Sequence, residues 1–410
     1  MKTFLYISLF LLINLCSTAK DVSKEISTPP LKVFYDGGGA LFSYLRTDIN
    51  FVQFVRNPIE AQVQLQINSQ QTGDGGKKYS FFFTGLGIFE NTNDTLVTSI
   101  PANVSDAEKN NELVRLVKLG LVTYISKTPY GKYVDVVFEE NVSTEPQEDN
   151  WDNWVFNIGL KSSLEGEESK KEFLWQTNLN VDRIKEESKI KIHGNFSNEI
   201  NKYEDDGELS KSSKKERLLS VLYVKSISPH FSAGISSEVK LRTYENIKTG
   251  INFSPALEYS VYPYSQSVRK RFTFLYRLGY SYNKYYRRTV FFKDRESLYQ
   301  HSLTIDYELN ELWGKAEFYL LTSNYLNDFS NNRIEFRTEF NFRISGSFFF
   351  DISAKASYVN DQIYLPAEDV TLEDILLNQI QLSTSYEYKF KFGVSYTFGS
   401  IYNSIVNTRF

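Results

Sequence analysis

The residues best suited to chemistry alternate along one stretch near the C-terminal end, residues 333–343. Charged or amide side chains fill every second position of it: Arg333, Glu335, Arg337, Glu339, Asn341 and Arg343. A period of two places all of them on one face of a β-strand. Guanidinium and carboxylate groups arranged in this way can sort passing solutes by charge. They can equally pair across strands and hold the strands in register, so two interpretations stay open.

Neighbouring stretches supply more charged residues with the same parity. The candidates for lining the interior of a barrel are Arg271, Arg277, Arg333, Glu335, Arg337, Glu339, Arg343, Lys389 and Lys391, joined by Asp306, Glu308, Lys315, Glu317, Asp351, Lys355 and Glu387. Both signs occur in similar number. The interior is therefore predicted either to be an open charged pore or to be filled by a ladder of salt bridges.

Alternation predicts the strands that carry these residues. In the last stretch, 386–398, aromatic or apolar residues alternate with polar or small ones. About twelve such stretches follow one another over residues 153–398, each near or above the 9–11 residues that cross a bilayer at a tilt. The clearest are 154–161, 173–181, 189–197, 231–242, 253–262, 270–283, 303–309, 314–321, 333–344, 348–358 and 386–398, and the stretch 218–224 is ambiguous in parity. We expect a mainly β fold, an antiparallel transmembrane β-barrel of about twelve strands after a small α/β domain.

The predicted connections differ in length at the two ends of these strands. Residues 184–187, 226–229, 263–266, 310–312 and 345–346 form short links, whereas residues 203–215, 284–298, 326–332 and 361–379 form longer, more polar ones. Short periplasmic turns and long outer loops are typical of bacterial barrels. We therefore expect both ends of the barrel, and the preceding domain, to lie in the periplasm.

The spacing of Lys391, Gly393, Tyr396 and Phe398 matches the signal that the outer-membrane assembly machinery reads on the last strand of its clients. With this signal and its alternating strands, the chain resembles Gram-negative outer-membrane β-barrel proteins. The resemblance implies outer-membrane lipid and the assembly machinery as partners. The tail at 399–410, which ends in Phe410, departs from the usual pattern and leaves open which aromatic residue is read.

The N-terminal stretch predicts export. Residues 4–15 are apolar, follow Lys2 and precede Ser17-Thr18-Ala19, which indicates a signal peptide comprising residues 1–19. The apolar run is shorter than the roughly 20 residues of a spanning helix. The single cysteine, Cys16, lies inside this segment, so thiol chemistry and disulfides are not expected in the mature chain.

Residues 28–140 predict a small periplasmic α/β domain. We expect a strand at 31–35, a helix at 40–56, a hairpin of strands at 61–67 and 78–89, a helix that begins with a capping box at Ser105 and Glu108, and a last strand at 134–138. Leu113, Leu116, Val117 and Leu119 line one face of that second helix. The order of elements resembles the TolB N-terminal domain and CsgG. The acidic segment 141–152 is the predicted linker.

Other groups give weak signals. Gly37-Gly38-Gly39 lacks the residues of a phosphate-binding loop, and the formal charge of −4 without a basic tract argues against nucleic acid. Among the three histidines, only His301, beside Ser302, suggests the Ser/His pair of an outer-membrane phospholipase. Acidic oxygens in 361–379 suggest Ca²⁺, or a short surface helix capped by Thr371. We expect no enzyme, cofactor or metal site.

Two functions fit these observations. The first is an outer-membrane channel for small solutes, with the periplasmic domain as a gate or docking point. The second is a non-conducting barrel that anchors a module for binding a periplasmic or secretion partner. The sequence identifies neither a solute nor a partner.

Overall fold

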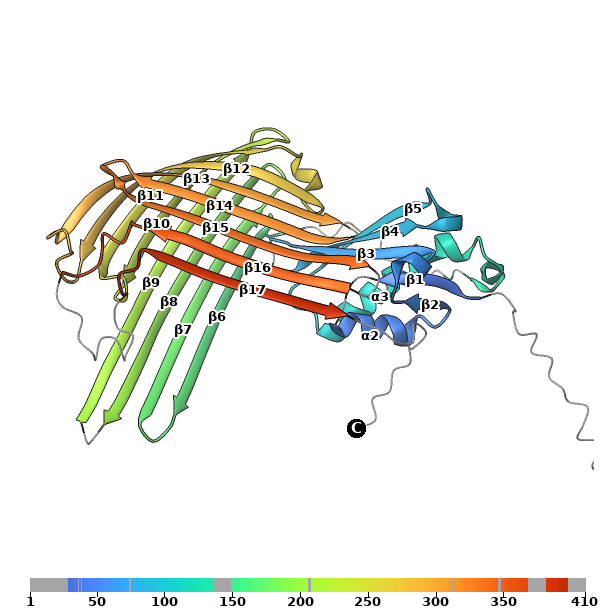
Figure 1. Cartoon of the computed structure of the whole chain (residues 1–410), viewed down its shortest axis with the longest axis horizontal. Coiled ribbons are helices and arrows are strands. Elements are labelled where there is room, and N and C mark those ends of the chain that lie inside the picture. Colours follow the sequence, from blue (N-terminus) through green and yellow to red (C-terminus); the bar gives the residue numbers. More distant parts are fainter. Residues whose placement is uncertain are drawn as a thin grey trace, which may run out of the picture.

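The computed structural model describes residues 29–137 and 149–396, apart from positions 36, 38, 74, 136, 206–207, 312, 346–347 and 368–380. A five-stranded sheet with two α-helices forms the N-terminal domain, and twelve antiparallel strands form a second, larger sheet (Figure 1). The predicted fold class is confirmed. The predicted signal peptide, most of the predicted linker and the tail lie outside the described residues.

The N-terminal domain packs its helices against one face of a mixed sheet. In chain order its elements are β1 (Leu31–Tyr35), α2 (Gly39–Asp48), β2 (Val52–Val55), η1 (Pro58–Glu60), β3 (Val63–Gln71), β4 (Lys77–Gly85), η2 (Gly87–Phe89), β5 (Asn93–Ile100), α3 (Asp106–Ile125) and η3 (Pro129–Tyr133). The strand order is β2-β1-β3-β4-β5. β1 runs parallel to β2 and β3, whereas β3, β4 and β5 are antiparallel neighbours.

Alternation explains which side of this sheet is covered. Leu65 of β3 and Phe81 and Phe83 of β4 point to the helices and are at most 1% exposed. Leu113 and Val117 of α3 meet them in the same core. The next residues along β3 and β4 are mostly polar, so the opposite face of the sheet is free to contact another surface.

Several expectations for this domain are corrected. The predicted helix at 40–56 ends at Asp48, because residues 52–55 form β2 beside β1. β5 was not predicted, and the described residues of the segment 134–138 are not in a strand. The capping box of α3 is confirmed, but Leu119 is 51% exposed and does not belong to the buried face. The suggested resemblance to TolB and CsgG stays a prediction.

The larger sheet is an uninterrupted antiparallel meander. Its strands are β6 (Trp154–Gly166), β7 (Lys170–Ile184), β8 (Ser188–Asp205), β9 (Glu208–Ser226), β10 (Phe231–Arg242), β11 (Ile247–Ser260), β12 (Lys270–Tyr285), β13 (Arg295–Glu311), β14 (Gly314–Tyr325), β15 (Asp328–Ser345), β16 (Phe348–Val359) and β17 (Tyr386–Tyr396), with η4 (Tyr264–Gln266) before β12. Every strand pairs with its sequence neighbours. Two polar stretches predicted as loops are corrected: residues 203–215 belong almost wholly to the paired ends of β8 and β9, and most of 326–332 belongs to β15.

The two faces of this sheet differ. The face that carries Glu317 and Arg337, here called the inner face, is concave, and small polar residues such as Ser254 and Thr304 are buried on it. The outer face carries large apolar side chains that are exposed on nearly every strand. Examples are Ile158, Leu160, Leu219, Val221, Phe253, Leu257, Tyr276, Leu278, Phe336, Tyr388, Phe390 and Phe392.

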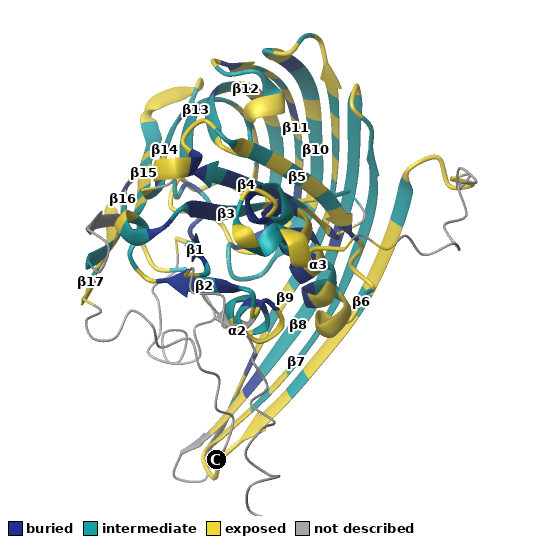
Figure 2. Cartoon of the chain, turned by 90° about the vertical axis from the view of Figure 1, so that its right-hand side faces the viewer, coloured by how far each residue is buried: buried dark blue, intermediate teal, exposed yellow. Residues whose placement is uncertain are grey.

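The sheet curves into a deep hollow whose edges are β6 and β17, and no ladder joins these two strands in the described structure. The N-terminal domain lies in front of one end of the hollow (Figure 2). We call this end the near end and the opposite one the far end. Because the number of strands is even, β6 begins and β17 ends at the near end (Figure 1).

Candidate functional site

Many of the predicted charged residues lie opposite one another on neighbouring strands, and they form two rows on the inner face. Glu308, Glu317 and Glu339 lie directly opposite one another on β13, β14 and β15. We call them the acidic row. Arg337, Lys355 and Lys389 lie opposite one another on β15, β16 and β17 and form the basic row. On β15, which belongs to both rows, Glu339 and Arg337 are two residues apart, about 7 Å along the strand.

Ion pairs link these rows to their surroundings. The Arg271 Nη2 atom lies 2.8 Å from a carboxylate oxygen of Asp306 and 2.8 Å from one of Glu308. Lys315 pairs with Glu317. The Arg337 Nε atom lies 2.9 Å from Glu335 Oε1.

The same network continues to the last strand of the sheet. The Arg337 guanidinium lies 3.9 Å from the centroid of the Tyr319 ring. The Lys355 Nζ atom lies 3.8 Å from Glu335 and 3.4 Å from Glu387. The cross-strand ladder that the sequence suggested is therefore present in β12–β17.

The ladder does not fill the hollow. The side chains of Arg337, Lys355 and Glu387 remain 51%, 40% and 45% exposed. A cavity of about 270 Å³ lies among the rows, lined by Arg271, Asp306, Tyr307, Glu317, Phe318, Tyr319, Arg337, Thr338, Glu339, Ser353, Ala354 and Lys355. Acidic and basic groups therefore face solvent together within one concave surface.

The remaining predicted lining residues share this face. Arg333 donates two hydrogen bonds of 2.9 Å to the carboxylate of Asp361. Arg277 lies opposite Ser302 and Ala256, and Lys391 lies opposite Ser353. Arg343 is opposite Phe349 in the ladder, but its side chain lies outside the described residues.

The inner face of β10 and β11 differs from that of β12–β17. It carries small residues at successive positions: Ser232, Gly234 and Ser236 on β10, and Gly250, Asn252, Ser254 and Ala256 on β11. These positions leave space beside the middle of β10 and β11, whereas the acidic and basic rows lie on β13–β17.

The near end is covered by contacts that sequence patterns did not predict. The Asn68 Nδ2 atom donates to the Val268 carbonyl oxygen at 3.2 Å, and the Gln70 Nε2 atom donates to Ser267 Oγ at 3.2 Å. The Arg269 guanidinium lies 5.5 Å from the centroid of the Phe82 ring. The uncovered face of the N-terminal sheet therefore rests on the β11–β12 connection.

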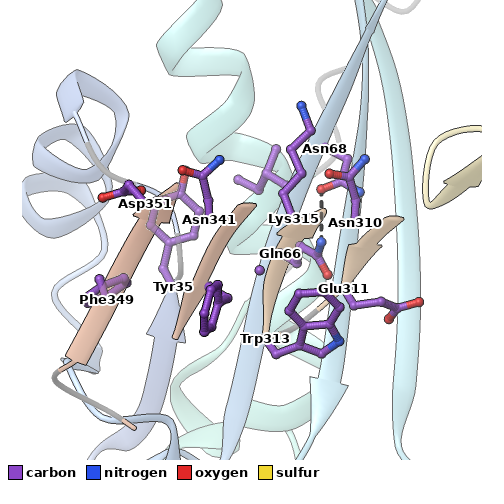
Figure 3. Close-up of a pocket in the computed structure, with 14 residues that line it drawn as sticks. Tyr35, Gln66, Asn68, Asn310, Glu311, Trp313, Lys315, Asn341, Phe349 and Asp351 are labelled. Carbon is purple, nitrogen blue, oxygen red and sulfur yellow. Dashed lines mark hydrogen bonds between the residues drawn. The ribbon is translucent and has the colours of Figure 1, made fainter. Parts of the chain in front are cut away.

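Two further places show that the domain spans the near end. At Gly73, in the β3–β4 turn, an ideal Cβ would lie 2.9 Å from the Ile184 Cβ at the end of β7. On the other side, a cavity of about 330 Å³ separates the domain from β13–β16 (Figure 3). Tyr35, Gln66 and Asn68 line it from the domain, and Asn310, Glu311, Trp313, Lys315, Asn341, Phe349 and Asp351 line it from the larger sheet.

The far end is crossed by the chain that follows β16. The Asn246 Nδ2 atom donates to the carbonyl oxygens of Arg287 and Tyr364, and the Val290 amide donates to the Leu365 carbonyl oxygen. Residues 361–367 are thereby held against the β10–β11 and β12–β13 connections. The Ca²⁺ site or helix predicted for 361–379 falls mostly on positions 368–380, outside the described residues.

The three histidines lie apart from one another and have different partners. His301 is on the outer face, with its Nδ1 atom 3.4 Å from the Tyr276 hydroxyl, whereas Ser302 is on the inner face. The Nδ1 atom of His193 lies 2.7 Å from Asn180 Oδ1, and that of His230 lies 2.8 Å from the Ser260 carbonyl oxygen. In the described part of the chain, no three His, Cys, Asp or Glu side chains are placed to bind a metal together.

Of the predicted assembly signal, Lys391, Gly393 and Tyr396 lie in β17, and Phe398 lies outside the described residues. Among the helices described, none has the length and apolar character needed to cross a membrane.

Comparisons with known proteins do not assign the chain to a family. No protein-family model matches the chain, and no curated protein matches it. Among solved structures, the chain is similar to the NanC porin in a rhombohedral crystal form, with 12% identity over 59% of this chain and 99% of that chain. The TM-score is 0.28, so this likeness carries no argument about function.

Proposed function

We propose that the protein is an outer-membrane β-barrel that conducts small solutes, with its N-terminal domain as a periplasmic gate. One observation supports this most strongly: a single twelve-stranded sheet has an exposed apolar outer face and a solvent-exposed charged inner face. A membrane wall around a water-filled path requires this division. The same sheet in water would leave a large apolar surface uncovered.

In the membrane the edges β6 and β17 pair with each other. Unpaired backbone groups in lipid cost several kcal/mol each, so a spanning sheet has to close. Both strands carry apolar residues outward, and they run antiparallel. Placing Trp154 opposite Tyr396 matches the faces along both strands and sets Asn157 opposite Gly393. Cysteines at these two positions should cross-link with a short thiol reagent, whereas Asn157→Cys with Lys389→Cys, farther apart on this register, should cross-link less.

The acidic and basic rows set the selectivity of the proposed channel. Glu339 accepts a hydrogen bond from Asn341 but has no ion pair in the described structure, and Lys389 has none either. Each row therefore presents charge to a passing ion. Single-channel recordings of the full protein in a planar bilayer should show steady conductance, and the reversal potential in a salt gradient should shift toward anions in a Glu317→Gln, Glu339→Gln variant. Absence of conductance would sink the channel proposal.

The gate rests on the contacts at the near end. Loss of the Asn68 and Gln70 hydrogen bonds should loosen the domain and raise the fraction of time that the channel is open. The matched control is Ser69→Ala, because Ser69 is exposed on the same strand and points to the other side. Equal open probability in the Asn68→Ala, Gln70→Ala variant and the control would count against a gate.

The alternative is a non-conducting barrel that anchors the N-terminal domain for a periplasmic partner. The ion-pair ladder and the covered ends of the hollow favour this alternative. It predicts no conductance in any variant and a specific protein bound to the domain. For the channel and for the anchor alike, we expect no catalysis and no cofactor.

A further inference from the structure

Three lysines face one another on the outer face of the large sheet, at its far end. Lys171 of β7 is directly opposite Lys202 of β8, and Lys202 is directly opposite Lys211 of β9. All three are exposed. Side chains directly opposite on neighbouring strands have Cβ atoms about 5 Å apart, and like charges at such positions repel. We call this set the lysine row.

The residues around the lysine row add positive charge. Lys215 and Arg217 follow on the same face of β9, and the Arg217 guanidinium lies 5.4 Å from the centroid of the Trp175 ring. By strand parity, the acidic residue nearest the row on this face is Glu204, whose side chain lies outside the described residues. Lys171, Lys202 and Lys211 form no ion pair among the described residues, although Glu167 and Glu168 lie in the adjoining β6–β7 turn.

Lysines on the inner face of the same strands are arranged differently. The Lys170 Nζ atom lies 3.6 Å from a carboxylate oxygen of Glu172, and the Lys214 Nζ atom lies 3.2 Å from one of Glu199. Both faces of β7–β9 thus carry lysines, but on the inner face the protein supplies the carboxylates. On the outer face no described carboxylate pairs with the lysine row, so an anion from outside the protein can bind there.

The surface below the lysine row is mostly apolar on β7 and β8, whereas β9 carries Ser213 and Lys215 there. Phe173 of β7 and Ile200 of β8 are opposite each other and lie one position closer to the near end on the same face. Val181, Leu179 and Trp175 continue that face along β7. A molecule that contacts both regions has an anionic head and an apolar tail. If the outer face meets lipid, the row lies where the headgroups of the outer leaflet begin.

We infer that the lysine row binds the phosphorylated headgroup of an outer-leaflet lipid, whose acyl chains lie along Phe173 and Ile200. The inference rests on the proposed placement of the sheet in the outer membrane. It does not depend on conduction. A phosphate carries the charge and the acceptor oxygens to bridge adjacent ammonium groups. The row also lies beyond the apolar face, where its lysines need not enter the hydrocarbon.

The test measures binding of diphosphorylated lipid A to the full chain in detergent by native mass spectrometry and by titration. The variant is Lys171→Gln, Lys202→Gln, Lys211→Gln, and the control is Lys170→Gln, Lys214→Gln on the inner face of the same strands. Each lysine beside an anionic lipid surface contributes about a fivefold change in affinity, so the triple variant should bind roughly 100-fold more weakly. The control should bind as the unaltered protein does.

Two comparisons separate a lipid from a free anion. Dephosphorylated lipid A should bind weakly to every form, and inorganic phosphate alone should not match the affinity of the phosphorylated lipid. Equal binding by the triple variant and the control would overturn the inference, as would equal binding of the two lipids or of inorganic phosphate. If the triple variant does not fold, Lys202→Gln alone should weaken binding about fivefold. A silent channel in the bilayer leaves these readouts unaffected, so failure of one proposal is distinguishable from failure of the other.

Discussion

Replacing Gly120 with alanine sets two opposing effects against each other in the N-terminal domain. Gly120 is buried in α3, where alanine is favoured over glycine by about 1 kcal/mol in the helix interior. The Cβ that alanine adds would lie 2.2 Å from two ring carbons of Phe83. Carbon atoms in contact are about 3.5–4.0 Å apart, so the ring or the helix has to move by more than 1 Å.

We expect the clash to be the larger effect. Phe83 is 1% exposed and packs within the core beneath α3, so its ring has no free space to enter. Overpacking of a core costs about 1–3 kcal/mol, and a clash of this depth belongs at the upper end. After the gain in helix propensity, the domain should lose about 2 kcal/mol of stability.

Hydrogen exchange of the α3 amides in the full chain measures this change without unfolding the large sheet. A loss of about 2 kcal/mol corresponds to exchange roughly 30-fold faster through openings of the domain. Leu119→Ala, at the exposed neighbouring position, should change exchange much less. Phe83→Leu in the Gly120→Ala background should restore part of the protection by making room. Slower or unchanged exchange in Gly120→Ala would refute the close packing of α3 on β4.

Three further changes have defined outcomes. Burial raises the pKa of Tyr124 to about 12, so the stability that its neutral phenol contributes is present below pH 10 and is lost as the pH rises from about 10 toward 12. Tyr124→Phe should lose about 1 kcal/mol at neutral pH with the hydrogen bond to the Thr92 carbonyl oxygen, and part of the alkaline loss in a thermal melt should vanish. Gly314→Ala should lower the yield of folded protein, because Gly314 has φ +138° and an added Cβ would lie 1.9 Å from the Asn341 carbonyl oxygen. The folded fraction is measured on a gel as the fraction whose mobility changes when the sample is heated. Asp361→Asn should weaken the pair with Arg333 by about 1–2 kcal/mol and speed proteolysis after residue 360, whereas an unchanged cleavage rate would show that the pair does not hold the loop.

The strands were predictable because each face of the sheet has one environment. The prediction was weakest at β9, where Leu218, Leu222 and Val224 face inward and break the alternation. It placed a loop at residues 203–215 because those residues are polar on both faces. β8 and β9 continue as a paired hairpin there, because backbone pairing between strands does not require an apolar face.

In the N-terminal domain, errors arose where local pattern and tertiary pairing disagree. The apolar residues between 41 and 55 have a spacing that suits one long helix. Val52, Phe54 and Val55 instead complete a strand that exists only because β1 is available to pair with it. β5 has a short alternating pattern at a sheet edge, and its pairing with β4 fixes it.

Of the candidate site, too, one part could be predicted from local pattern and the other part depends on tertiary contacts. Parity alone predicted which charged residues share the inner face, because parity is a property of each strand by itself. Which of them stand opposite each other depends on register, and the contacts of Asn68, Gln70 and Gly73 depend on how two separate sheets meet. The alternating amides of Gln64, Gln66, Asn68 and Gln70 gave a signal of a polar face that packs on something, without indicating what.

A disulfide across the near end tests the proposed gated channel most directly. In a Gly73→Cys, Ile184→Cys variant the two Cβ atoms need to move apart by only about 1 Å to reach the 3.5–4.5 Å of a disulfide, and the one other cysteine is Cys16, in the predicted signal peptide. Single-channel conductance is recorded before and after reduction, with the Gly73→Cys single variant as control. The account predicts a low open probability while the disulfide is intact and a rise on reduction that the control lacks. The same conductance in both states would contradict the gate, and no conductance in either state would contradict the channel.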